Sequence, residues 1–349
     1  MVGVRCTAAP WQGWLLPRGL VAARFSRSAV VPGARFRRGE PGSGPRFSTP
    51  ARPTPGCPAH QWRRPRPAGH RLAKESSIRI FLSFAGVIIA IVILVCVGLS
   101  IRPRPFPPFP ETPPSLATVP LPRGLPAPVE RFYRTVYGDS VPLIENVVMT
   151  GRATIRPMLN IPLPARFVFA YSTGRDYRHY FEATFFGLPF LKVNEGYLDG
   201  QSFFESPMGT YYDDANTNQA ANLALWAEGA MFPAILVTDP RVRWEPLDDR
   251  TALLFVPYGD REESFVVRFN PQTAMIDAME AMRYRDPGEG HDKILWITRN
   301  EDGPRLEGSP LSAVGSATWL DQGRPWAVFT VESIVHNVDL GTYIRRRGR

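Results

Sequence analysis

The uncharged stretch from Ile80 to Ile101 constrains this chain more than any other feature, because it is built almost wholly from Ile, Val, Leu, Phe, Ala and Gly. At a rise of about 1.5 Å per residue, a helix of about 22 residues spans roughly 33 Å, which matches the hydrocarbon core of a bilayer. A cleavable signal peptide is the main alternative, but its apolar segment is usually only ~7–15 residues long and ends at a small-residue cleavage site. We therefore predict a single transmembrane helix over residues 78–101.

The charged residues are distributed unevenly on the two sides of this helix. Residues 1–79 hold 15 Lys and Arg residues against two acidic ones, whereas the rest of the chain holds 26 basic and 30 acidic residues. Cytoplasmic flanks of membrane helices carry an excess of Lys and Arg. We therefore expect a single-pass membrane protein with a cytoplasmic N-terminus and an extracytoplasmic C-terminal domain.

Residues 1–75 are dominated by Arg, Pro, Gly and Ala, with too few large apolar side chains to offset the entropy of ordering them. We expect a disordered basic arm. Three interpretations stay open: an arm that touches anionic lipid or nucleic acid, an organelle targeting peptide, or an overextended start of the reading frame without function. We favour the last, and we expect no nucleic-acid partner.

Closely spaced prolines follow the predicted helix and precede the folded domain. They favour an extended spacer over residues 102–124, which would lift the domain off the bilayer. The folded domain is expected over residues 125–345. Because all three cysteines (Cys6, Cys57 and Cys96) precede it, disulfides and cysteine-bound metals are excluded there.

The pattern of the domain is mostly that of β-strands separated by tight turns. Residues 146–156 alternate between apolar or small and polar side chains, which is typical of a half-exposed strand. Asp199-Gly200 predicts a two-residue hairpin turn, and similar turn signals recur at strand-length intervals. A short helix is expected from Pro128, and one long helix from about Ala215 to Phe232 with Asp214 or Asn216 as its cap.

Several predicted strands are apolar on both faces: Phe167–Tyr171, Leu253–Val256, Ile294–Ile297 and Val328–Val331. Two helices cannot cover both faces of a wide sheet, so a sheet curled over its own interior is the economical arrangement. We expect an α+β fold: a strongly curved, half-barrel-like antiparallel sheet of about 9–11 strands, with the long helix against it. The interior could be a solid core or a ligand cavity, and a ligand cavity would measure about 300 Å³ or more.

No arrangement of titratable residues matches a familiar catalytic or metal-binding motif. None of the five histidines pairs with another at metal-ligand spacing. His179 falls in a predicted strand, where a satisfied or surface histidine is the expectation. No phosphate-binding glycine loop or nucleophile elbow is present. We expect no metal and no cofactor.

Glu228 is the most interesting carboxylate, since it lies among Ala, Gly and Trp on or near the buried face of the long helix. A buried carboxylate needs a partner or a raised pKa. Arg241, Arg243 or a tyrosine hydroxyl could be that partner. A structural hydrogen-bonded pair and an exposed edge residue are the alternatives to a catalytic role.

The segment after the long helix resembles a bacterial family. The helix end reads A-E-x-x-x-x-P from Ala227 to Pro233, and a strand and turn read V-x-W-E-x-x-D-D from Val242 to Asp249. This pair of motifs is similar to the uncharacterised family DUF6544, a domain of unknown function, over about residues 125–345. The resemblance implies a shared fold and no established activity. In outline the expected architecture is also similar to the half-barrel of bacterial lipoprotein carriers, which is an analogy of architecture only.

The leading functional hypothesis is a membrane-anchored extracytoplasmic domain that binds an apolar small molecule or lipid inside the curled sheet. The expected ligand-binding residues are Phe181, Phe185, Trp226, Glu228, Phe232, Trp244, Phe255 and Trp296. Two alternatives stay open: an enzyme of unknown reaction that uses Glu228 with nearby arginines, and a structural or partner-binding ectodomain without a pocket.

Overall fold

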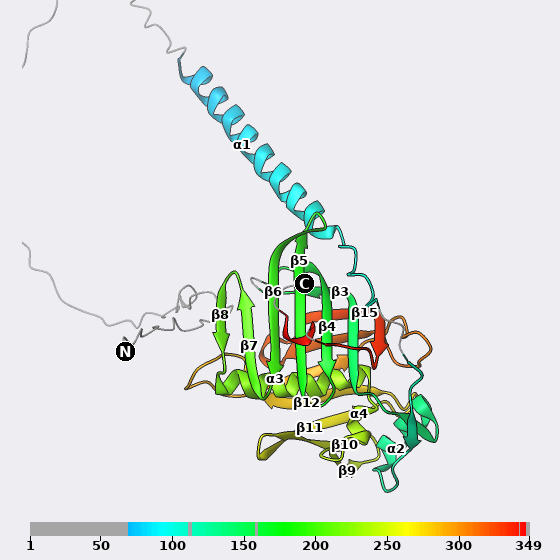
Figure 1. Ribbon diagram of the computed structural model, residues 1–349. Coiled ribbons are helices and arrows are strands. Elements are labelled where there is room, and N and C mark those ends of the chain that lie inside the picture. The colour runs from blue at the N-terminus through cyan, green and yellow to red at the C-terminus, as the bar shows by residue number, and fades with distance from the viewer. Residues whose placement is uncertain (1–68, 111–113, 158–159, 342, 347–349) are drawn as a thin grey trace, which may run out of the picture. The chain divides into compact units, whose positions relative to one another are not determined.

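A computed structural model describes residues 69–110, 114–157, 160–341 and 343–346 (Figure 1). The basic arm expected over residues 1–75 lies outside the described residues as far as residue 68. The chain divides into two compact units, and the boundary between Ile89 and Ala90 falls within the first helix. The folded domain belongs to the unit that contains residues 90–349.

Helix α1 (Gly69–Ser100) contains the predicted membrane segment. Within the described part of the chain, its portion Arg79–Ser100 is the one helix that is long and apolar enough to cross a membrane. Length and composition fit a membrane anchor and a signal segment alike. The helix begins nine residues before the predicted start at residue 78, so residues 69–75, which we assigned to the disordered arm, are helical.

Antiparallel pairing between strands builds the domain. A separate ribbon joins β1 (Thr118–Pro120) and β2 (Ser140–Pro142), and thirteen further strands form one sheet in the order β8-β7-β6-β5-β4-β3-β15-β14-β13-β12-β11-β10-β9. These strands are β3 (Asn146–Ile155), β4 (Leu163–Ser172), β5 (Asp176–Phe185), β6 (Leu188–Leu198), β7 (Gln201–Ser206), β8 (Gly209–Tyr212), β9 (Arg243–Asp248), β10 (Thr251–Tyr258), β11 (Arg261–Phe269), β12 (Ile276–Arg283), β13 (Ile294–Asn300), β14 (Val314–Trp319) and β15 (Pro325–His336). The sheet is therefore wider than the 9–11 strands expected, because short strands such as β8 carry no clear apolar alternation.

Two runs of sequential hairpins meet at one long-range pair of strands in the middle of the sheet. Strands β3 to β8 form one run and β9 to β15 form the other, and β15 lies antiparallel to β3 with Met149 opposite Ile334. The predicted Asp199-Gly200 turn joins β6 to β7, with φ angles of 52° and 83°. Such positive angles at both turn positions match the twist of the flanking strands.

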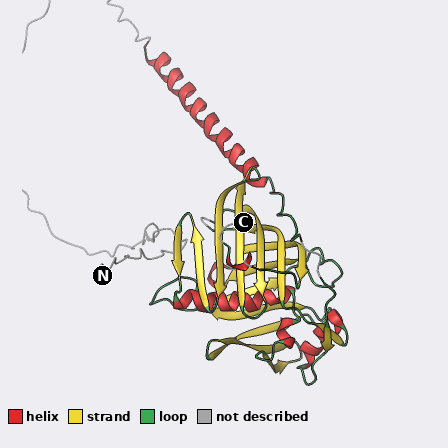
Figure 2. Cartoon of the chain, viewed as in Figure 1, coloured by secondary structure: helices red, strands yellow, loops and turns green. Residues whose placement is uncertain are grey.

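Helix α3 (Ala215–Glu228) lies across the sheet and shows how strongly the sheet is curved (Figure 2). It packs against β6 and β7 from one half of the sheet and against β10 and β12 from the other half. One helix can contact both halves only because the sheet curls around it. The predicted cap is present, since the Asp214 side chain accepts a hydrogen bond from the Thr217 N–H at 3.0 Å.

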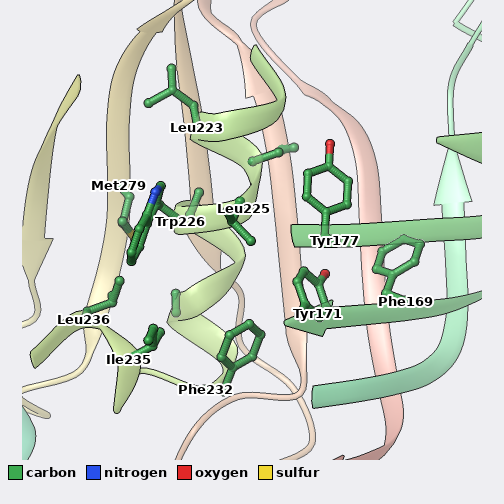
Figure 3. Close-up of a cluster of buried hydrophobic side chains, with 14 of the residues drawn as sticks. Phe169, Tyr171, Tyr177, Leu223, Leu225, Trp226, Phe232, Ile235, Leu236 and Met279 are labelled. Carbon is green, nitrogen blue, oxygen red and sulfur yellow. The ribbon is translucent and has the colours of Figure 1, made fainter. Parts of the chain in front are cut away.

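The long helix ends earlier than the predicted residue Phe232. A 3₁₀ turn (Gly229–Met231) follows α3, and a short helix α4 (Ile235–Thr238) comes after Pro233. The main core lies between α3, α4 and the concave face of the sheet, where Trp226, Phe232 and Leu236 are buried (Figure 3). Helix α2 (Ala127–Tyr137), with Pro128 in its first turn as predicted, contributes Phe132 to the same core.

The convex face of the sheet is covered by two segments, the proline-rich linker that precedes the sheet in sequence and the C-terminal end that follows it. Phe106 from the proline-rich linker is 3% exposed and packs with Val168 and Tyr180 of the sheet and with Val338 from the C-terminal end. The expectation of a detached spacer is therefore wrong for this part of the linker. The alternation expected for β3 is present in part: its apolar face is buried throughout, and on the other face Asn146, Arg152 and Thr154 stay half-buried, whereas Val148 and Thr150 are buried.

Replacing Phe106 with alanine tests this cover. Because the ring is nearly fully buried, we expect Phe106→Ala to lower the free energy of unfolding by about 3 kcal/mol. The measurement is thermal or denaturant unfolding of the full-length chain in detergent. Phe190→Ala is the matched control, since that ring is 56% exposed. Equal, small effects of both substitutions would contradict a structural role for the linker.

Candidate functional site

A cavity of about 180 Å³ lies between the concave face of the sheet and α3. Its apolar walls come mainly from aromatic and methionine side chains of the sheet, and four alanines of α3 complete the helix side: Ala220, Ala221, Ala224 and Ala227. The enclosed space is smaller than the ~300 Å³ at which ordinary ligand pockets begin. It can hold a ring or the end of an alkyl chain, since an apolar cavity of about 150 Å³ is sufficient for benzene.

Three of the eight expected binding residues line this cavity: Phe181, Glu228 and Trp296. The other five lie elsewhere. Trp226 and Phe232 are part of the solid core, and Phe185 lies at the β5–β6 end of the sheet. Trp244 donates a hydrogen bond to the Leu236 carbonyl at 2.8 Å, and Phe255 lies beneath the Arg243 guanidinium at 3.6 Å.

The cavity is also lined by residues that the sequence analysis did not predict. Phe167 and Phe169 on β4 and His179 on β5 line it, together with Glu195 on β6 and Arg283 on β12. Strand register could have pointed to part of this set. Phe169 lies opposite His179, and His179 lies opposite Glu195, so all three share one face of the sheet.

A buried histidine between two carboxylates forms the polar part of the site. The His179 Nδ1 atom lies 3.2 Å from Glu195 Oε1, and its Nε2 atom lies 3.0 Å from Glu228 Oε2. The Tyr171 hydroxyl donates to Glu228 Oε2 at 2.7 Å and lies 3.0 Å from His179 Nε2. Phe169 stacks on the imidazole with ring centroids 3.8 Å apart. We name His179, Glu195, Glu228 and Tyr171 the polar cluster.

The carboxylates keep His179 charged despite its burial. Burial alone lowers the pKa of His179, but the charge of Glu228 and the hydrogen bonds to both glutamates outweigh it and raise this pKa to about 9. The imidazolium then donates from both nitrogens. The side chains of Glu195 and Glu228 are 32% and 27% exposed, against 3% for His179, so the carboxylates are more accessible than the imidazole between them.

Of the three partners considered for Glu228, the structure contains one. The tyrosine hydroxyl is present as Tyr171, but neither arginine contacts Glu228. Arg241 instead binds Asp239 and the Gly174 carbonyl, and Arg243 binds Glu262. The enzyme hypothesis therefore loses the arginines named for it, whereas Glu228 does line a cavity.

Arg283 supplies the second positive charge of the interior. It is half-buried, and desolvation lowers its pKa while the charges of Glu195 and Glu228 oppose that change. Its Nε atom donates to the Ala220 carbonyl at 3.0 Å, and its guanidinium lies over the Trp296 ring at 4.5 Å. The Trp296 indole N–H is buried without a hydrogen-bond partner among the described residues. Arg283 is therefore a cationic hydrogen-bond donor in the wall of the cavity.

Comparison with protein-family models assigns the chain to a family. Residues 115–331 match the model of the family of unknown function DUF6544, and the chain belongs to this family. No curated protein matches it.

Solved structures with a similar outline include a LolA superfamily protein from Nitrosomonas europaea. It is 12% identical with a TM-score of 0.38, and the match covers 64% of this chain and 99% of that protein. A putative outer membrane lipoprotein-sorting protein domain from Vibrio parahaemolyticus is 7% identical with a TM-score of 0.35, covering 62% of this chain and 93% of that domain. Likenesses at this level carry no conclusion about function.

The polar cluster makes stability depend on pH. Since the pKa of His179 is about 9 in the folded state against 6.5 for an ordinary histidine, its contribution is fully present below pH 6.5 and is lost as the pH rises through 9. The size of this contribution is about 3 kcal/mol. We expect His179→Gln to lower the melting temperature at pH 6 and to flatten its fall between pH 6.5 and pH 9.5.

The control for this experiment is His291→Gln, in the exposed loop between β12 and β13. Melting temperatures of the full-length chain in detergent would be measured at several pH values for all three proteins. A His179→Gln variant whose melting temperature changes with pH as steeply as that of the unmodified chain would rule out the charged histidine.

Proposed function

We propose that this protein is a membrane-anchored binding module that holds an apolar chain or ring of an amphipathic molecule, such as a lipid, inside its curled sheet. The observation that carries this proposal is the cavity itself. Its walls combine aromatic side chains with the charged groups of Glu195, Glu228 and Arg283. A molecule with an alkyl or aromatic portion and an oxygen-rich polar group is complementary to such a wall.

The size of the cavity limits the ligand. About 180 Å³ accommodates one ring or a few methylene groups. A whole lipid therefore does not fit within this volume, and its remaining part has to extend out of the cavity. Arg283, Arg285 and Arg299 line the cavity and are donors suited to a carboxylate, ester or phosphate oxygen.

Anchoring by α1 supports the lipid class of ligand. The uncharged segment is long enough to cross a bilayer. The excess of basic residues before this segment favours a cytoplasmic N-terminus and, with it, an extracytoplasmic binding domain. A binding domain tethered there meets membrane lipids as its most abundant apolar molecules.

Native mass spectrometry of the full-length chain, released from detergent after purification from membranes, tests the proposal. We expect an additional mass that organic extraction recovers as an apolar or amphipathic molecule. Ala224→Met fills the cavity from α3 and should abolish this mass. Ala215→Met, the same change at an exposed position of α3, should leave it in place. An unliganded mass for the unmodified chain, both as purified and after incubation with a lipid extract, would contradict the proposal.

A second candidate function is acid–base catalysis by Glu228. It is favoured by one observation: Glu228 lines the cavity and accepts a hydrogen bond from Tyr171 beside a charged histidine. The test compares the unmodified chain with Glu228→Gln after incubation with a membrane lipid extract. New product masses that form only with the unmodified chain would favour catalysis. Identical mass spectra would contradict it, and the binding module would then be the function that remains.

A further inference from the structure

The β5–β6 hairpin ends in an apolar tip that the cavity does not use. Six consecutive residues from Phe185 to Phe190 carry no polar side chain. Leu188 is 70% exposed, Phe190 56% and Phe186 37%. Hairpin turns in water favour polar residues such as Asn-Gly, and a cluster of large apolar side chains at a tip marks an interaction site.

The turn itself is built around an unusual residue. Phe186 and Gly187 occupy the two central positions with φ angles of 53° and 74°. Glycine adopts such angles freely, whereas a bulky side chain at positive φ is strained. A phenylalanine therefore gives this turn no advantage in backbone energy. Its ring packs edge-on against Phe185, with ring centroids 4.8 Å apart, and lies close to Gly98 of α1.

The tip is attached to the last turn of α1. The Phe186 N–H donates to the Gly98 carbonyl at 2.9 Å. A side chain at Gly98 would collide with the Phe185 ring, since an added Cβ would lie 2.3 Å from it. Gly98 is three residues before Ile101, the end of the uncharged stretch, so the attachment lies about 5 Å inside that end along the helix.

Positive charges flank the apolar tip. Lys192 on β6 and Arg102 and Arg104 after α1 are all exposed. Basic residues next to apolar ones are typical of segments that enter the headgroup region, where the cations meet lipid phosphates.

We propose that the β5–β6 hairpin tip inserts Phe186, Leu188 and Phe190 into the surface of the bilayer that α1 spans. The inference rests on the membrane anchoring proposed above. It adds a second membrane contact to the protein, made by the binding domain itself. Strand β5 then leads from the membrane surface to the cavity, because Phe181 on this strand lines the cavity four residues before Phe185.

Site-directed spin labelling of the full-length chain in vesicles of phosphatidylcholine and phosphatidylglycerol tests the inference. Single cysteines are introduced as Leu188→Cys or Phe190→Cys in a chain whose native cysteines are replaced by serine. Collision rates of the label with oxygen, which concentrates in lipid, and with a water-soluble nickel complex report its environment. We expect a ratio of oxygen to nickel collisions several-fold higher at both positions than for Leu247→Cys, which is 58% exposed on β9.

A label at Val92→Cys in α1 separates the two proposals. A lipid environment at Val92 together with water at Leu188 and Phe190 would overturn the hairpin inference and keep the anchor. Water at all of these positions would overturn both. All four substituted side chains are exposed, so the labels disturb little packing.

Discussion

A wide sheet with apolar residues on both faces has to be covered twice, and the rest of the domain follows from this constraint. On the concave side, α3 and the turn after it fill most of the space, with Trp226 and Phe232 in the core. On the convex side the linker and the C-terminal end provide the cover, through Phe106, Val338 and Tyr343. A segment that composition marks as a spacer is thereby part of the fold.

The concave side is incompletely filled, and charged side chains of the interior line the cavity that remains. Two carboxylates beside an apolar cavity are costly unless they are compensated. His179 provides the compensation through both ring nitrogens, and Arg283 adds a second positive charge nearby. Removing either positive charge leaves a carboxylate without its balance. The polar cluster is therefore at once a structural requirement of this interior and the group that a bound polar atom would meet first.

The sequence predicts those features that arise from short-range patterns. The apolar stretch of α1, the Asp199-Gly200 turn and the Asp214 cap each depend on neighbouring residues and are present as predicted. The polar cluster is different, because Glu195 and Glu228 come from separate elements that only the strand register and the position of α3 bring to His179. The buried linker was likewise missed, since the prolines around Phe106 give the same pattern whether that segment is free or packed. Most of the expected cavity residues are aromatic and apolar, and these properties alone do not distinguish a cavity wall from a solid core.

The pairing of β3 with β15 has a consequence for the order in which this protein can be made. The middle of the sheet joins the first long strand of the domain to the last, with Met149 opposite Ile334. Each run of hairpins can form locally during synthesis, but the central seam closes only when the final strand has emerged. Until then, both half-sheets expose a long unpaired edge, which is a template for aggregation. A ribosome that stops before residue 325 therefore leaves a product with an open edge on each half and no native middle, and the growing chain has to be protected from aggregation until its last strand emerges.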